Sequence, residues 1–454
     1  MMNTKKQKLL NGNLRKLLFT FSLPTVVGMI VASLYNLVDT IFVGKGVGPL
    51  AIAAITLILP IMMIFLSIAT MIGMGSASII SRALGAGNQK KAVSAMAGAF
   101  TLGLLFIIPL VILLYIFKDM ILALFGADPV VFQYATSYFA IVLPGFFFFT
   151  LSFIASQIIR AEGMERAAIY PLIIGALLNI VLDWLFIFEM NMGVEGAALA
   201  TSISQFAMFL AVVLYFTFAK TIFNLRKNKF HLEPALLKDN LKIGFPSFIE
   251  MISSSIIFIL LNSLILQYGN EIYLAIAGIG QRIILISLRP VFGIGFSFST
   301  ITSFNYGAEK LRRVKKVLKE AILWVVLLLC TIYVIIFAIP DILLSVFSND
   351  KTLILQGMMP LRIMALLLPF RGFFIMGRSF FQAIGKPRQA LIINVSYIFI
   401  LIPLFYILPL FMGINGVFAS WPIAVFISAC LSGIFLFKEI RVLDQSIRQL
   451  KAGY

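Results

Sequence analysis

The stretch LLFTFSLPTVVGMIVASLYNLVDTIFV, residues 17–43, decides the fold of this chain. It is longer than the roughly 20 apolar residues that a helix needs to cross a bilayer, and comparable runs follow it to the end of the sequence. Apolar residues make up 61% of the 454 residues, against about 45–50% in a soluble domain. The runs do not alternate, which excludes a transmembrane β-barrel. We therefore predict an all-α integral membrane protein whose first span, residues 17–43, is retained.

Twelve spans are predicted from the apolar runs. They cover residues 17–43, 50–80, 92–117, 130–158, 167–188, 196–219, 243–267, 272–304, 317–339, 354–382, 389–412 and 415–437. Most of the 36 Lys and Arg residues fall in the terminal segments and in every second loop, which is the positive-inside pattern for two cytoplasmic termini. We expect a multi-pass protein of a prokaryotic plasma membrane. Its net charge of +18 then reflects the topology of the chain. We expect the basic residues to contact lipid headgroups, and not nucleic acid.

The two halves of the chain resemble each other at a shift of about 222 residues. Leu-Ala-Ile-Ala at 50–53 recurs at 274–277, and Gly-Ala at 85–86 recurs at 307–308. Six spans per half is an even number, so both halves have the same orientation and form a parallel repeat about a pseudo-twofold axis. We predict an N-terminal six-helix lobe at 1–219, a basic cytoplasmic linker at 220–242 and a C-terminal six-helix lobe at 243–454.

Three acidic residues, Asp39, Asp183 and Glu250, lie inside long apolar runs. A carboxylate at the centre of a membrane span costs about 2.5–3.5 kcal/mol on insertion scales. Such groups are kept mainly to bind an ion, to relay a proton or to pair with a buried cation. They favour a coupled membrane transporter over a passive anchor.

Four polar residues of the first lobe are predicted to lie at a similar depth. Asp39 comes five residues before Gly44 and Asp183 six residues before Glu189, at the outer ends of spans one and five, and Thr201 comes five residues after Gly196 at the start of span six. Each is then roughly 8–9 Å below the outer surface, and Asn179 lies one turn deeper than Asp183 on the same face. Two carboxylates, an amide and a hydroxyl suit Na⁺ or a shared proton. We predict a cation-coupling site at these four residues, where the metal ion would be Na⁺.

The second lobe carries a different set of charges. Glu250 lies roughly 12 Å above the inner surface, and the arginines Arg282, Arg289 and Arg371 lie in spans eight and ten. Glu250 is either a second proton site or the partner of Arg289 or Arg371, and the sequence favours neither. The arginines either snorkel and pair or form a basic wall that attracts anionic groups. These four residues are a candidate second-lobe polar site.

Other chemistry finds little support in the sequence. There is one histidine, His231, and it lies in a polar stretch. The phosphate-binding pattern G-x-x-x-x-G-K-[ST] is absent, so the chain does not itself use ATP. A membrane-embedded acyl or glycosyl transferase would need clustered His or Asp residues in an interfacial loop, and the loops contain none. We expect a protein that is not an enzyme and has no cofactor.

From about residue 14 to 440 the chain resembles the multidrug and toxic compound extrusion (MATE) family. The residues that carry the resemblance are Pro24 with Tyr35-Asn36-Leu37-Val38-Asp39-Thr40, Ile80-Ser81-Arg82-Ala83-Leu84-Gly85-Ala86-Gly87, Asn305-Tyr306-Gly307-Ala308 and Gln382-Ala383-Ile384-Gly385-Lys386-Pro387. The resemblance implies an antiporter of two six-helix lobes. It also implies a cation site at Asp39, Asn179, Asp183 and Thr201. Some branches of the family place an essential acid further along span seven, where this chain has Ser254 and Ser255, so that role is not assigned to Glu250.

Two functions follow as hypotheses. The first is a secondary active antiporter that exports organic, often cationic or amphipathic, compounds in exchange for H⁺ or Na⁺ by alternating access. The second is a flippase of a lipid-linked saccharide or lipid precursor, which the basic second lobe would favour. The expected partners are small-molecule substrates and membrane lipid, and we expect a monomer.

Overall fold

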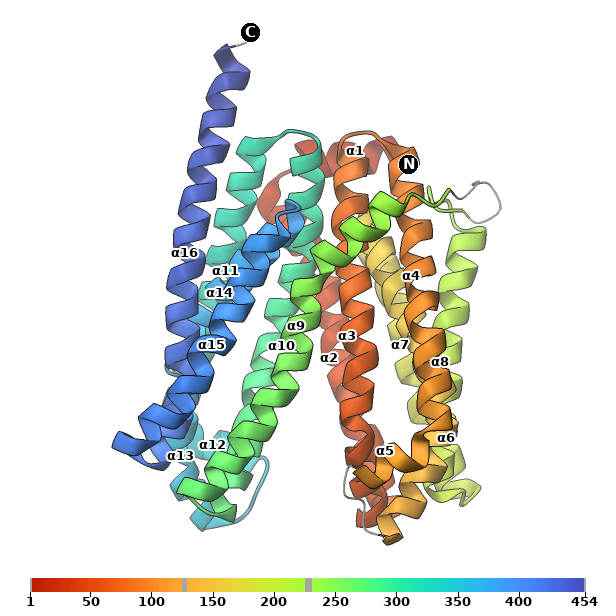
Figure 1. The fold of residues 1–454 in the computed structure, drawn as a ribbon, viewed down its shortest axis with the longest axis vertical. Helices are drawn as coiled ribbons and strands as arrows, with labels where there is room; N and C mark the ends of the chain where they lie inside the picture. The colour runs from red at the N-terminus through yellow and green to blue at the C-terminus, as the bar shows by residue number, and fades with distance from the viewer. Residues whose placement is uncertain (1, 125–128, 225–230, 453–454) are drawn as a thin grey trace. The chain divides into compact units, whose positions relative to one another are not determined.

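The computed structural model describes residues 2–124, 129–224 and 231–452, without the side chains of residues 2–6, Asn36 and 450–452. Residues 225–230 of the predicted linker, and the side chain of Asn36 in the family motif, therefore lie outside the described part. The described residues contain twelve helical spans that are long and apolar enough to cross a membrane. Figure 1 draws the helices along the chain. This confirms the predicted all-α membrane fold.

The helices extend past the apolar runs that predicted them. In the first half they are α1 (Met2–Asn11), α2 (Leu14–Gly46), α3 (Pro49–Gly85), α4 (Gln89–Ile116), α5 (Lys118–Leu124), α6 (Pro129–Ala161), α7 (Glu165–Asp183), the π-helical segment η1 (Trp184–Glu189) and α8 (Gly193–Phe218). In the second half they are α9 (Pro234–Tyr268), α10 (Glu271–Gly307), α11 (Leu311–Ala338), α12 (Pro340–Ser345), α13 (Lys351–Ala365), α14 (Leu368–Ala383), α15 (Pro387–Met412) and α16 (Ile414–Ala452). The apolar runs predict only the part of each helix that lies in the membrane, and the helix itself continues beyond that part.

The chain forms two compact units that exchange the starts of their first helices. The N unit is Val27–Met251, and the C unit is Met1–Val26 together with Ile252–Tyr454. Helix α2 therefore begins in the unit that contains α10–α16, and α9 begins in the unit that contains α3–α8. The lobe boundaries at 219 and 243 stay a prediction drawn from the repeat.

Equivalent hydrogen bonds make the repeat visible inside both units. The hydroxyl of Ser81 on α3 donates to the carbonyl of Ala161 at 3.0 Å. The hydroxyl of Ser303 on α10 donates to the carbonyl of Ala383 at 2.8 Å. Both donors and both acceptors are separated by the same shift of about 222 residues, so the second helix of each half meets the end of the fourth helical span in the same way.

The turns of the two halves repeat as well. After α6 and α14 the chain reverses through Gly163 and Gly385, with φ of 80° and 76°. At the first residue of α8 the chain passes Gly193, and just before α16 it passes Gly413, with φ of 60° and 56°. Glycine adopts these left-handed conformations without steric cost, which explains why glycine stands at both members of each pair.

The start of α9 packs closely on α3 within the N unit. A Cβ atom at Gly244 would overlap the backbone carbonyl of Met71, and one at Gly75 would overlap the carbonyl of Asn240. Backbone therefore touches backbone at two levels of this pair, as small residues allow between membrane helices. The contact depends on glycine at both positions.

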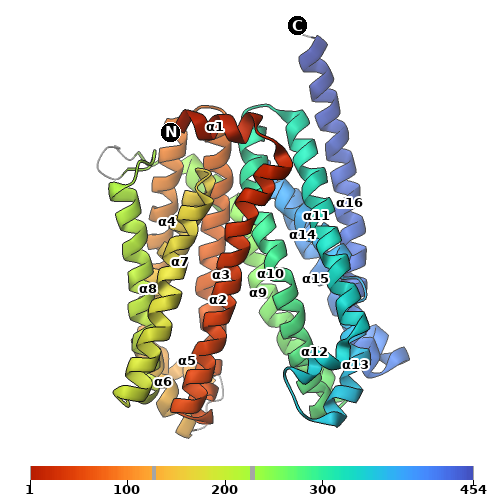
Figure 2. The same cartoon turned by 180° about the vertical axis from the view of Figure 1, so that it is seen from behind.

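The N-terminal segment is held on the corner between α10 and α11 within the C unit. Leu9 is buried, and its carbonyl accepts hydrogen bonds from the Asn305 amide at 3.2 Å and the Arg313 guanidinium at 3.3 Å. Arg313 also donates to the carbonyl of Gly12 at 2.9 Å. A cation at the C-terminal end of α1 satisfies free carbonyls and complements the helix dipole. This end of the C unit also carries the C-terminal part of α16 (Figure 2).

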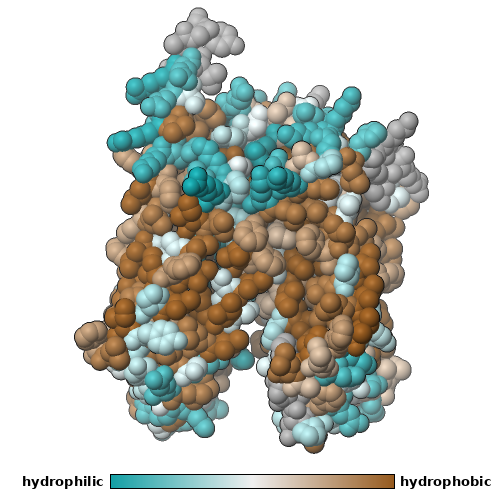
Figure 3. Space-filling model, in the orientation of Figure 1, coloured by the Kyte–Doolittle hydropathy of each residue, from teal (hydrophilic) through white to brown (hydrophobic). Residues whose placement is uncertain are grey.

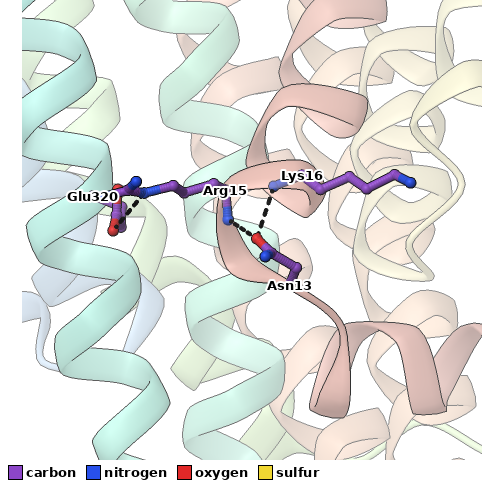
Figure 4. Close-up of polar contacts among 4 residues, drawn as sticks. All are labelled: Asn13, Arg15, Lys16 and Glu320. Carbon is purple, nitrogen blue, oxygen red and sulfur yellow. Dashed lines mark hydrogen bonds and ion pairs between the residues drawn. The ribbon is translucent and has the colours of Figure 1, made fainter.

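Helix α2 begins with a capping residue and an ion pair (Figure 4). The side-chain oxygen of Asn13 accepts from the backbone N–H of Arg15 at 3.0 Å and of Lys16 at 3.3 Å, as an N-cap does. Arg15 Nε then lies 2.9 Å from Glu320 Oε2 on α11. The first turn of α2 is therefore joined to α11.

The face of each unit that Figure 3 shows has polar ends and an apolar middle. Ion pairs lie at the polar ends, where Lys386 and Glu439 are 2.6 Å apart and Lys315 pairs with Asp444. The exposed apolar side chains of the middle belong to most of the spanning helices. This distribution is expected for helices whose outer faces contact lipid.

Candidate functional site

The two acids of the first lobe meet in the N unit. Asp39 on α2 and Asp183 at the end of α7 lie within hydrogen-bonding range of each other, side chain to side chain. Two ionised carboxylates offer only acceptors, so a hydrogen bond between them requires that one carries a proton. The structure thus brings together the two residues on which the predicted site depends.

Asp183 and Asn179 present buried oxygen atoms without protein donors. Asp183 is fully buried and Asn179 is 3% exposed. Apart from the contact between Asp183 and Asp39, neither carboxylate oxygen of Asp183 nor the side-chain oxygen of Asn179 has a hydrogen-bond partner in the described residues. Buried acceptors left in this state are costly, and a proton or a cation would satisfy them. The oxygen-rich donor set suits H⁺ or Na⁺.

The fourth predicted residue, Thr201 on α8, joins the site through a residue that the sequence analysis missed. The hydroxyl of Tyr138 on α6 hydrogen-bonds Thr201 and lies close to both Asp39 and Asp183. Tyr138 is 7% exposed. A tyrosine hydroxyl inside an apolar span needs a polar partner, and this was the available signal. Four helices therefore contribute to the site.

A helical irregularity follows the acid pair directly. Asp183 ends α7, and the next six residues form the π-helical segment η1. The backbone N–H of Met190 donates to the carbonyl of Leu185 at 2.9 Å, so the wider turn continues to the end of the span. Single π-helical turns recur at functional positions of helices. Here the wider turn begins at the carboxylate that is fully buried.

Metal-binding clusters of the usual acidic kind are missing from the described residues. Within them, no group of three or more His, Cys, Asp or Glu side chains could hold a metal ion. A cation at Asp39 and Asp183 would therefore also draw on neutral oxygens. Asn179 and Thr201 carry such oxygens near the pair.

The predicted second-lobe site is divided between the units. Glu250 belongs to the N unit, whereas Arg282, Arg289 and Arg371 belong to the C unit. Arg282 is exposed, and the other three residues are partly buried. A joint role for the four residues stays a prediction.

Arg371 is part of a polar cluster inside the C unit. The hydroxyl of Tyr397 on α15 lies in hydrogen-bonding range of Arg371 on α14 and of Trp421 on α16. Arg371 was a candidate from the sequence, whereas neither aromatic residue was. Another arginine of span ten, Arg362, has a different environment, since it donates to the carbonyl of Phe337 at 3.1 Å and stacks on that ring.

Comparison with known proteins agrees with the repeat and the fold. A family model described as MatE matches residues 24–185 and again residues 246–407. The two matches are separated by the shift that relates the two halves of the sequence. Together they cover most of the chain, including Asp39, Asp183 and the whole of α3 and α10.

Full-length relatives extend the agreement beyond the matched segments. The multidrug export protein MepA of Staphylococcus saprophyticus is 27% identical over 422 residues, which are 92% of each chain. MepA of Staphylococcus aureus is 26% identical over 439 residues, covering 95% of this chain and 96% of the relative. A solved structure described as the outward-facing conformation of a multidrug resistance MATE family transporter has a TM-score of 0.90 and 27% identity, and covers 96% of this chain and 98% of that one. With its paired matches, twelve spans and shared fold, the chain belongs to the MATE family of transporters.

Proposed function

We propose that this transporter exports organic, often cationic or amphipathic, compounds in exchange for H⁺ or Na⁺. The substrate class is supported by its relatives, which are named multidrug export proteins. The coupling is supported by one observation above all, the contact between the Asp39 and Asp183 side chains inside an apolar bundle. Two carboxyl groups in contact inside apolar spans are costly unless they bind a proton or a cation.

The pair links the ion to the packing of α2. With a proton or Na⁺ bound, Asp39 and Asp183 can remain together, and Asn179 and Thr201 supply neutral oxygens beside them. Without the ion the two carboxylates repel, so the arrangement that holds α2 against α7 loses stability. An ion can shift the transporter between access states only through such a difference in affinity.

The experiment is export by purified protein in proteoliposomes, with ethidium as the probe. A sodium gradient and a proton gradient are imposed separately, and Asp39→Asn and Asp183→Asn are compared with wild type. Ethidium movement that follows one gradient and disappears in both variants is the expected result. Movement that is unchanged in both variants would remove the acid pair from the coupling mechanism.

The placement in the membrane belongs to the same proposal. We propose a monomer in a prokaryotic plasma membrane with both termini in the cytoplasm, as the distribution of Lys and Arg indicates. Single cysteines introduced at Lys118 and at Lys315, in the background Cys330→Ser with Cys430→Ser, test the orientation. A membrane-impermeant maleimide added to intact cells should label position 118 and leave position 315 unlabelled.

A flippase of a lipid-linked saccharide or lipid precursor is the second candidate. The observation that favours it is Arg371 with its neighbouring donors Tyr397 and Trp421, because guanidinium groups suit phosphates. A deletion strain with normal envelope synthesis but increased drug sensitivity would favour export over lipid flipping.

A further inference from the structure

Span ten is broken in its middle, and the break is explained by the sequence. Helix α13 ends at Ala365 and α14 begins at Leu368. Pro369 stands in the first turn of α14, where its ring would clash with the carbonyl four residues earlier in a continuous helix and where its missing N–H breaks the ladder. The interior of the C unit therefore contains the N-terminal end of a half-helix. Discontinuous helices of this kind line binding sites in transporters.

Arg371 lies in the first turn of this half-helix. The N-terminal end of a helix carries a partial positive charge, and α14 has neither an acidic residue in its first turn nor a side-chain cap on Leu367. The guanidinium charge is therefore added to a helix end that is already positive. An anion at this point would interact favourably with both.

No carboxylate balances Arg371 among the described residues. Its guanidinium lies in hydrogen-bonding range of the hydroxyl of Tyr397, which carries no charge to balance it. The ion pairs of the C unit use other residues, namely Arg15 with Glu320, Lys315 with Asp444 and Lys386 with Glu439. A charged group inside a span without a counter-ion is a functional site by default.

The atoms around Arg371 are mostly donors. The Tyr397 hydroxyl faces both the guanidinium and the indole of Trp421, and the buried Trp421 N–H makes no well-formed hydrogen bond in the described residues. A guanidinium, an indole N–H and a phenol offer many donors to the single Tyr397 oxygen. A carboxylate or phosphate would supply the missing acceptors.

A buried aromatic ring lies beside the cluster. The ring of Phe374, which is 8% exposed, lies 5.7 Å from that of Tyr397, centroid to centroid. Aromatic side chains of this kind accept flat apolar groups. The cluster therefore combines apolar aromatic surface with a cationic guanidinium group.

We propose that Arg371, Tyr397 and Trp421 form a binding site for the acidic group of amphipathic aromatic compounds. Arg371 binds the carboxylate or phosphate with two N–H groups, and Tyr397 and Trp421 donate from the side. The inference rests on the proposed export function for its physiological meaning, since it adds compounds with an acidic group to the substrates. The acidic group comes either from an exported compound or from an anionic lipid headgroup.

The test uses Trp421 as a local reporter. The chain has three tryptophans, so Trp184→Phe with Trp324→Phe leaves Trp421 as the sole donor for energy transfer to a pyrene. Pyrenebutyrate and its uncharged methyl ester are titrated against this protein in phosphatidylcholine nanodiscs. We expect energy transfer with both probes. The acid should bind at least about tenfold more tightly than the ester, because only the acid forms a charge-assisted hydrogen bond with Arg371.

Variants of Arg371 decide the proposal. Arg371→Gln should remove the preference for the acid and leave ester binding unchanged, which also verifies the fold. Arg371→Lys should keep part of the preference, because it retains the charge but not the planar fork. The matched control is Arg362→Gln, which removes an arginine from the same span and should keep the full preference. An unchanged acid preference in Arg371→Gln, or equal binding of acid and ester by the parent protein, would overturn the proposal.

Two further measurements distinguish a lipid headgroup from an exported compound, and the proposed binding site from the proposed export function. Phosphatidylglycerol added to the nanodiscs should compete with pyrenebutyrate in the parent protein if the group is a lipid headgroup, and should leave it bound if the group belongs to an exported compound. Ethidium export by the control variant Arg362→Gln should remain at the wild-type level, because Arg362 contacts Phe337 and lies outside the proposed site. Absence of ethidium export in wild type would refute the proposed function and leave the binding result standing.

Discussion

The carboxyl group of Asp39 on α2 contacts the carboxyl group of Asp183 on α7, and Asp183 is fully buried. The two residues come from helices far apart in the sequence, and each lies in a run of apolar residues. A contact of this kind is stable when the pair holds a proton or a cation, and repulsive when it holds neither.

Replacing either acid should stop coupled export without loss of folded protein. Asp39→Asn and Asp183→Asn keep the shape of the side chain and remove the charge that the ion uses, so we expect export to fall at least about tenfold. Resistance to ethidium and the amount of protein in the membrane are the measurements. Asp119→Asn, at an exposed acid on α5, is the control and should behave as wild type.

Removing the hydroxyl of Tyr138 should weaken ion binding moderately. Tyr138→Phe leaves the ring in place but deletes the hydrogen bond to Thr201. Loss of one such bond corresponds to roughly a three- to tenfold change in affinity. The concentration of H⁺ or Na⁺ that gives half-maximal export should rise by that factor. Tyr134→Phe, one turn earlier on α6, should leave it unchanged, and equal effects of both variants would contradict the assigned role of Tyr138.

The Arg15–Glu320 ion pair should contribute little to stability. The Arg15 side chain is 68% exposed and that of Glu320 10%, and pairs with one solvated partner are worth about 0.2–1 kcal/mol. A double-mutant cycle with Arg15→Gln and Glu320→Gln, read by thermal unfolding in detergent, should give a coupling energy within this range. The coupling should fall at high salt, because the exposed charge is screened.

Glycine at 244 should be required, whereas glycine at 278 should not. An added methyl group at Gly244 would overlap the Met71 carbonyl, while a Cβ atom at Gly278 would meet nothing within 4 Å. We expect Gly244→Ala to lower the unfolding temperature or the yield of folded protein. Gly278→Ala should be neutral or stabilising by up to about 1 kcal/mol, because alanine favours the helix. Equal behaviour of the two variants would show that α9 can move away from α3 at little cost.

The sequence was sufficient for the features that depend on local chemistry. Long apolar runs predicted twelve spans, the recurrence of Leu-Ala-Ile-Ala at 50–53 and 274–277 predicted the repeat, and the cost of a charge in hydrocarbon drew attention to Asp39 and Asp183. Each of these signals is carried by a short segment. None of them requires knowledge of which helices are neighbours.

Features that arise from packing were not predictable in this way. Tyr138, Tyr397 and Trp421 are ordinary residues of apolar spans until a partner from another helix approaches. The broken span ten was read as one continuous run at 354–382, although Pro369 marks the interruption. The lobe boundaries at 219 and 243 were predicted from sequence similarity between the halves. This similarity does not show against which helices the start of a helix packs.

The exchange of helix starts bears on how such a protein could have arisen. If a gene encoding one six-helix half had been duplicated, each copy would supply the opening turns of its first helix to the other copy. A solitary half would then lack part of its own packing, so the ancestral product would have needed a sister molecule before the two genes fused. For the same reason, either half of this chain made alone should fold poorly, and the two halves should form the folded protein when they are made in one cell.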